Sequence, residues 1–308
     1  MTDNSKEYLI YLEDVYQKYP EKSGRLKTVL NDIDFRARGG EFITVIGPTG
    51  CGKSTLLRLI LGSEKPYSGK ALINGVAVSS PNPCCGIVYQ KYSLFPHLTV
   101  LENVIFGPEL EKFCLLEKYY KPFLYRKKRK EFKEEALEYL KRVGLADDAN
   151  KYPYQLSGGM RQRVAIVQAL IMKPKILLMD EPFGALDDST RQVMQLFILE
   201  QWEKMKMTIF FVTHDLEEAL FLGTRIIALS QYYQTDCPDC EGSKIVIDKA
   251  ISGGHPKPTH FKYAKEFNNL LEEVRRDGLD PNHRQHISQF DLSHKDAFRT
   301  VSVDEWKR

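Results

Sequence analysis

Residues Gly47 to Thr55 read Gly-Pro-Thr-Gly-Cys-Gly-Lys-Ser-Thr, and they fit the pattern G-x-x-x-x-G-K-[ST]. Residues 41–46 before them favour a buried strand, and residues 56–61 after them suit a helix. A glycine-rich turn between a strand and a helix N-terminus directs backbone N–H groups and the helix dipole at an anion. Lys53 suits the β- and γ-phosphates of a nucleotide, and the Ser54 hydroxyl suits Mg²⁺. We therefore predict a phosphate-binding loop.

Composition limits the classes of protein that the chain can belong to. With 308 residues it can bury a large core and form one or two domains. The formal net charge of +3 is small for this length, which argues against bulk binding to nucleic acid. No apolar run reaches the roughly 18 residues that span a bilayer, and the N-terminus has no signal-peptide core. The six cysteines are scattered, unlike a secreted disulfide framework, which favours the cytoplasm.

Polar side chains follow further apolar runs, where the carboxyl edge of a parallel sheet would gather them. Gln90 ends one run, and it suits either a water or Mg²⁺ contact or an ordinary strand end. Asp180 and Glu181 end a second run, where two acids are costly unless they hold a cation or act chemically. Asp180 suits Mg²⁺ through water, and Glu181 suits polarising a nucleophilic water. His214 ends a third run. The sequence predicts that these side chains lie at one sheet edge.

A second glycine-containing stretch precedes a helix. Residues 156–163 read Leu-Ser-Gly-Gly-Met-Arg-Gln-Arg, in which Ser157 is a good N-cap residue. Gly158 and Gly159 expose backbone N–H groups at the helix start, so the stretch is either a simple cap or a second anion site.

Residues 94–144 lack strand alternation and are predicted to form a helical subdomain inserted into an α/β core. Within them, Leu137, Leu140 and Val143 are expected on one buried face, with Gly144 as the C-cap. Near the end of the chain, residues 261–276 predict an amphipathic helix that stops at Gly278.

Together these motifs resemble the nucleotide-binding subunit of ATP-binding cassette transporters, over about residues 8–250. The motifs that carry the resemblance are Gly47 to Thr55, Gln90, residues 156–162, residues 176–181, residues 185–187 and His214. The resemblance implies an α/β fold: a P-loop NTPase (RecA-like) core with an antiparallel β subdomain and a helical subdomain inserted at about residues 91–160. The cassette would cover residues 1–252, and residues 253–308 would form a C-terminal extension.

The resemblance also assigns roles at the matching positions, with ATP and Mg²⁺ as cofactors. Glu181 would be the catalytic carboxylate and His214 the switch histidine, while Gln90 would link the phosphates to the helical subdomain. The metal contacts would be Ser54, Gln90 and Asp180. The nucleotide contacts would be Tyr19 as the adenine-stacking aromatic, then Gly47, Pro48, Thr49, Gly50, Cys51, Gly52, Lys53, Ser54, Thr55, Ser157, Gly158, Gly159, Gln162 and Asp187.

The implied function is that of an ATPase subunit that powers an importer by ATP-driven closure of a homodimer. Two ATP molecules would lie between the phosphate loop of one copy and Ser157 to Gly159 of the other. Residues 92–104 and 183–187 resemble importers of the nitrate, sulfonate, taurine and bicarbonate group. Such a subunit would dock on two membrane-spanning permease partners at the cytoplasmic face of the inner membrane, with a substrate-binding protein in the complete system.

Two other classes are less favoured. A soluble ATPase of this fold acting on nucleic acid or the ribosome would carry long coiled coils or two cassettes. Residues 55–156 hold no sustained heptads, and only one phosphate loop occurs. A catalytically dead regulatory subunit would lack the acid, glutamine or histidine, whereas Glu181, Gln90 and His214 are all present.

Two stretches depart from the family pattern. Residues 109–134 are longer than usual and place Phe123 beside five consecutive cations, Arg126 to Lys130. A solvated helix face and a contact with anionic lipid or the membrane partner both remain open. Cys237 and Cys240 form a C-x-x-C turn, which suits either a reduced loop or half of a zinc site completed by histidines such as His255 and His260.

Overall fold

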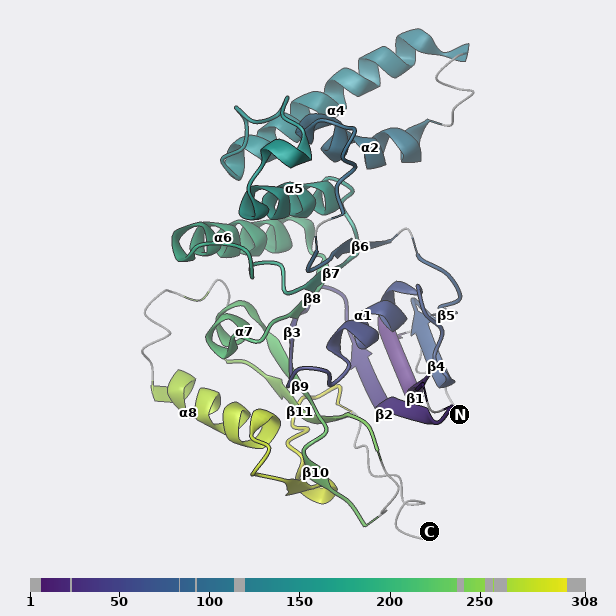
Figure 1. The fold of residues 1–308 in the computed structure, drawn as a ribbon, viewed down its shortest axis with the longest axis vertical. Helices are drawn as coiled ribbons and strands as arrows, with labels where there is room; N and C mark the ends of the chain where they lie inside the picture. The colour runs from purple at the N-terminus through teal and green to yellow at the C-terminus, as the bar shows by residue number, and fades with distance from the viewer. Residues whose placement is uncertain are drawn as a thin grey trace. The chain divides into compact units, whose positions relative to one another are not determined.

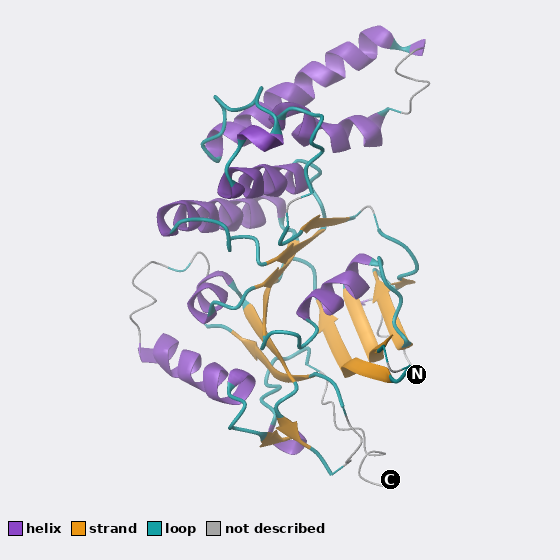
Figure 2. Ribbon diagram, viewed as in Figure 1, coloured by secondary structure: helices purple, strands orange, loops and turns teal. Residues whose placement is uncertain are grey.

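The computed structural model describes residues 7–22, 24–82, 84–91, 93–113, 120–236, 241–252, 257 and 265–297. The chain divides into two compact units, of which the first combines Met1–Cys85 with Lys206–Arg308 and the second is Gly86–Met205. Figure 1 labels the elements along the chain, and Figure 2 separates helices from strands. No helix in the described ranges combines the length and the apolar character that a bilayer crossing requires.

The first unit holds most of the strands. Its elements are β1 (Ile10–Pro20), β2 (Leu26–Ala37), β3 (Phe42–Ile46), α1 (Lys53–Leu61), β4 (Ser68–Ile73), β5 (Val76–Ala77), β8 (Thr208–Val212), α7 (Leu216–Leu222), β9 (Arg225–Ser230), β10 (Tyr233–Gln234), β11 (Lys244–Ala250), α8 (Lys265–Val274), the π-turn Arg275–Leu279, β12 (Gln285–His286) and the 3₁₀ turn Ile287–Gln289.

The central strand of this unit is β3, which lies between β8 and β9 and runs parallel to both. All five residues of β3 and of β8 are buried, as expected for parallel strands covered on both faces. β11 adds an antiparallel edge beside β9. A separate antiparallel sheet has the order β2-β1-β4-β5. The predicted α/β core with an antiparallel β subdomain is confirmed.

The second unit is mainly helical. Its elements are β6 (Cys85–Val88), α2 (Val100–Lys112), α4 (Pro122–Arg142), the 3₁₀ turn Pro153–Gln155, α5 (Gly158–Leu170), β7 (Ile176–Asp180) and α6 (Asp188–Met205). α2 packs against α4 and α5, and β7 neighbours β6. β7 is buried except at Asp180, so the polar end of this strand alone reaches the surface. The predicted helical subdomain is present in the described residues.

Described residues beyond β11 pack on the other elements of the first unit. α8 inserts Phe267 and Val274 into a cluster with residues of α7, β9 and β11, while Leu270 and Leu271 pack at its edge. Further along, the backbone of Asp291 accepts from the Asp248 N–H at 2.8 Å, and β12 pairs with β10. These contacts bury apolar side chains and give a backbone N–H on the edge of β11 a hydrogen-bond partner. Residues 265–297 are therefore held to the strands of this unit.

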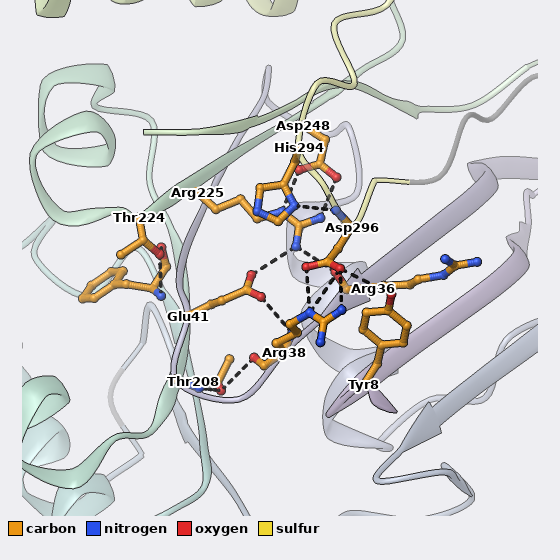
Figure 3. Close-up of polar contacts among 12 residues, drawn as sticks. Tyr8, Arg36, Arg38, Glu41, Thr208, Thr224, Arg225, Asp248, His294 and Asp296 are labelled. Atoms are coloured by element: carbon orange, nitrogen blue, oxygen red, sulfur yellow. Dashed lines mark hydrogen bonds and ion pairs between the residues drawn. The ribbon is translucent and has the colours of Figure 1, made fainter. Parts of the chain in front are cut away.

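A buried polar network accompanies this packing (Figure 3). Arg225 on β9 is 1% exposed and donates two hydrogen bonds of 2.6 Å to the Asp248 carboxylate on β11. The same guanidinium lies 3.1 Å from Glu41 and 4.7 Å from the centre of the Phe35 ring. Because every charge in the network has a partner, these contacts offset the desolvation cost of burying a guanidinium.

The end of the described chain joins the same region. Asp296 is buried and accepts hydrogen bonds from Arg38 at 3.1 Å and from the Tyr8 hydroxyl at 3.3 Å (Figure 3). Burial alone would raise the pKa of Asp296, but the Arg38 guanidinium outweighs it and lowers that pKa. Burial and the nearby Arg225 charge lower the pKa of His294, whose ring accepts a hydrogen bond of 3.2 Å from the Asp296 N–H.

Two local predictions were wrong. Leu137 is 39% exposed, whereas Leu140 and Val143, predicted on the same face, are buried as expected, together with Ala136 and Tyr139. Gly278 does not stop the last helix but lies inside the π-turn that follows α8. A Cβ on Gly278 would lie 3.0 Å from the Cβ of Ala228, so a close approach to β9 accounts for the glycine.

Candidate nucleotide-binding site

The phosphate loop connects β3 to α1 in the first unit. Only glycine fits at its first position, because a Cβ on Gly47 would lie 2.3 Å from the Leu229 carbonyl oxygen and 2.6 Å from the Cys51 sulfur. Gly52 is the N-cap of α1 and has a φ of 97°, in the left-handed region that favours glycine, so no side chain caps the helix. The N–H groups at this helix start therefore face the loop without a side-chain acceptor.

Lys53 extends over the loop. Its ammonium group donates to the carbonyl oxygens of Gly47 at 2.8 Å and Pro48 at 3.0 Å. Thr49, Gly50 and Ser54 are exposed, whereas Cys51 is buried beneath the loop and burial raises the pKa of its thiol. Exposed backbone and hydroxyl groups beside one lysine fit nucleotide phosphates, and the Ser54 hydroxyl fits a hard cation such as Mg²⁺.

Tyr19 and His214 belong to the same unit. Tyr19, near the end of β1, is half-buried and donates its hydroxyl to Glu64. Burial, with the Glu64 carboxylate, raises the pKa of Tyr19. His214 is exposed and is the second residue after β8, and the next residue, Asp215, caps α7 by accepting from the Glu218 N–H at 3.1 Å. The predicted stacking and switch roles of Tyr19 and His214 stay predictions.

The acidic pair lies at the end of β7 in the second unit. Asp180 is the last strand residue, and Glu181 follows in the left-handed region with a φ of 46°. A non-glycine residue held in this conformation costs of the order of 1–3 kcal/mol and is common at functional sites. The Glu181 carboxylate accepts a hydrogen bond of 2.9 Å from the Gln90 amide. The structure thus brings two of the predicted catalytic residues into contact.

The stretch from Ser157 also lies in the second unit. Ser157 is the N-cap of α5 and accepts from the Met160 N–H at 3.2 Å. Gly159 packs against the loop before α6, since a Cβ there would lie 3.1 Å from the Ala185 carbonyl oxygen. Ser157 itself remains exposed. The capping role that the sequence allowed is therefore present, and the exposed helix start leaves the anion role open to a ligand.

Gln162 and Asp187 flank this stretch. Gln162 is 1% exposed and donates to the Tyr89 carbonyl oxygen at 3.3 Å, so it holds α5 to the segment that carries Gln90. Asp187 accepts from the Ser189 hydroxyl at 2.5 Å and from the Thr190 N–H at 3.0 Å. These hydrogen bonds lower the pKa of Asp187. Asp187 thus fixes the start of α6 beside the loop that contacts Gly159.

Sequence reasoning missed Asn103. This residue is fully buried in α2, and its amide donates to the carbonyl oxygens of Phe95, Leu98 and Thr99 at 3.1, 3.0 and 2.9 Å. Its side-chain oxygen also accepts from the Phe95 N–H at 2.8 Å. The sequence could have indicated this residue, because the capping box of Thr99 and Glu102 predicts the helix start, and Asn103 directly follows Glu102.

The possible zinc ligands Cys237, Cys240, His255 and His260 lie outside the described residues. Among the residues that the structure does describe, one group of acids is close enough to share an ion, and it consists of Asp14, Asp32 and Asp34. Lys244 already pairs with Asp32 at 2.8 Å.

The strand, glycine-rich loop and helix, with the paired acids at a second strand end, define the class of P-loop nucleotide-binding proteins. The family profile described as ABC transporter matches residues 30–184. The aliphatic sulfonates import ATP-binding protein SsuB of Bacillus cereus is 42% identical over 86% of this chain and 96% of that protein. The nitrate import ATP-binding protein NrtD of Synechocystis is 37% identical over 84% and 94%.

A solved structure agrees. It is a dimeric ATP-binding cassette in a post-hydrolysis state bound to ADP and Pi, with 29% identity and a TM-score of 0.65. The similarity covers 80% of this chain and 100% of that one. The chain belongs to the ABC transporter family, in which it is an ATP-binding subunit and an ATPase. The predicted family and activity are confirmed.

Proposed function

We propose that the chain powers an importer of a small anionic solute, such as a sulfonate or nitrate, by hydrolysing ATP. The observation that carries the proposal is that this chain matches 96% of the length of a sulfonate importer subunit and 94% of a nitrate importer subunit. Its permease partners would span the inner membrane and hold it at the cytoplasmic face. A substrate-binding protein would deliver the solute to those partners.

The chain's own residues would divide the chemistry. When bound, Mg·ATP supplies the phosphoryl group and a metal that neutralises charge on the phosphate oxygens. Lys53 would leave its loop carbonyls to hold the β- and γ-phosphates, and Ser54 with Asp180 would hold the metal directly or through water. Glu181 would accept a proton from the attacking water, while its hydrogen bond from Gln90 orients the carboxylate.

We further propose that two copies close head to tail around two ATP molecules. The exposed Ser157 and the N–H groups at the start of α5 would contact the γ-phosphate held by the other copy. Support comes from the capping geometry of this stretch and from the dimeric state of the solved relative. ATP would then act as a bridge, so dimer formation would depend on nucleotide.

The test is a trapped dimer. Glu181→Gln keeps the side-chain shape but cannot take a proton, so ATP should bind and persist. Size-exclusion chromatography should show a dimer of this variant with ATP and Mg²⁺, and Ser157→Arg in the same background should abolish it. Ser79→Arg, at an exposed serine in the first unit, is the matched control and should leave the dimer intact. A Glu181→Gln chain that stays monomeric with saturating ATP contradicts the bridging mechanism.

The solute is tested with the purified partners. The complete transporter in proteoliposomes should take up a labelled alkanesulfonate or nitrate only with internal ATP. If the transporter hydrolyses ATP normally but takes up neither anion, the proposed solute class is refuted and the ATPase assignment stands.

A further inference from the structure

The first half of α4 has two faces of different character. One face packs against α2: the Tyr125 hydroxyl donates to the Glu109 carboxylate at 3.1 Å, and Arg129 donates to it at 2.7 Å. The Tyr125 ring also meets Phe113 edge to face, with centroids 5.4 Å apart. This face is therefore fixed within the second unit, and the opposite face of the helix is left exposed.

The opposite face combines an exposed ring with cations. At 3.6 residues per turn, Phe123, Arg126, Lys127 and Lys130 share one side of the helix. Phe123 is 85% exposed, and all three cations are exposed. Within the described ranges, no ion pair involves Arg126 or Lys127, and the pair of Lys130 with Glu134 is long at 3.8 Å.

Favourable hydration explains why the cations are exposed, but it does not explain why apolar side chains are exposed among them. Exposing a phenylalanine rather than burying it costs about 1.5–3 kcal/mol. Tyr120 is also 74% exposed and Leu124 45% exposed at the same end of the helix. Residues 120–130 contain no acid, and although Glu109 pairs with Arg129 and Glu131 with Lys128, Arg126 and Lys127 have no ion pair with another described residue. Aromatic and apolar side chains between exposed cations complement a surface that is apolar beneath an anionic layer.

We propose that this face of α4, consisting of Phe123, Arg126, Lys127 and Lys130, binds the anionic phospholipids of a membrane surface. Phe123 enters the boundary between headgroups and acyl chains, and the three cations reach lipid phosphates. This contact lies outside the ATPase chemistry, since the face carries none of the residues proposed to bind nucleotide. It would add a direct lipid contact to the attachment that permease partners provide.

The test is flotation of the purified full chain with vesicles of phosphatidylcholine alone or mixed with phosphatidylglycerol. The chain should float only with the mixed vesicles, and less in high salt, because screening weakens headgroup attraction. Arg126→Gln/Lys127→Gln/Lys130→Gln should lower the partition coefficient roughly a hundredfold at low salt, from about 1 kcal/mol for each cation at an anionic surface.

The matched control removes the same charge elsewhere in the second unit. Lys141→Gln/Lys175→Gln/Lys204→Gln changes three exposed lysines and should leave flotation within about twofold, since these side chains lie outside the proposed face. An equal loss in both triple variants, or a wild-type chain that ignores mixed vesicles, overturns the proposal. So does a wild-type chain that binds a single-stranded oligonucleotide but no vesicle.

Insertion of the ring has its own readout. Phe123→Trp should show an additional blue shift of tryptophan emission when mixed vesicles are added, because the indole leaves water. Leu196→Trp places the same reporter at a 53% exposed position on α6 and should not shift. The same small shift in both variants would contradict the insertion of residue 123 into lipid.

Discussion

The buried ion pair between Arg225 and Asp248 predicts a large loss of stability when one partner is removed. Asp248→Ala deletes two hydrogen bonds of 2.6 Å and leaves a guanidinium that is 1% exposed. Breaking such a pair from one side costs about 3–5 kcal/mol. Arg225 keeps Glu41 at 3.1 Å and the Arg36 carbonyl oxygen at 2.7 Å, so we expect the lower end, about 3 kcal/mol.

Urea unfolding followed by circular dichroism measures this loss as a fall in the midpoint at an unchanged slope. Glu241→Ala is the control, because its pair with Arg25 has the same chemistry but side chains 69% and 55% exposed. That variant should lose less than about 1 kcal/mol. Arg225→Met/Asp248→Leu should be more stable than Asp248→Ala, because the buried guanidinium is removed together with its carboxylate partner. Equal losses in Asp248→Ala and Glu241→Ala would refute the reasoning.

Three further predictions concern the site and its supports. Gly159→Ala should destabilise the chain by about 1–2 kcal/mol in the same assay, because the new Cβ meets Ala185, whereas Gly158→Ala, with open space around it, should change little. Asn103→Leu should cost about 2–4 kcal/mol by leaving buried backbone groups unpaired, and a loss below 1 kcal/mol would contradict that. Burial, with neighbouring acids, raises the pKa of Asp34 to about 6, so wild type should lose stability relative to Asp34→Asn as the pH rises from 5 to 8. A pH-independent difference would refute that assignment.

Local patterns predicted the phosphate loop, the capped start of α5 and the acids that end β7, because each depends on neighbouring residues in the chain. The sequence predicted Gln90 and Glu181 at one sheet edge, but their hydrogen bond could not be predicted from local patterns, since it joins residues from two strand ends. The pairing of Arg38 with Asp296 joins positions 258 residues apart and gives no local signal. Leu137 shows the same limit: helical periodicity groups it with Leu140 and Val143, which are buried, but the packing of α4 leaves Leu137 itself 39% exposed.

ATP turnover by Lys53→Ala tests the central claim most directly. The side chain of Lys53 contacts only loop carbonyls among the described contacts and is not part of the core, so the variant should keep the wild-type circular dichroism spectrum. We expect its rate of phosphate release from ATP to fall to background, because the cation that holds the β- and γ-phosphates is gone. Equal turnover by two equally folded proteins would contradict the assignment of residues 47–55 as the site of ATP hydrolysis.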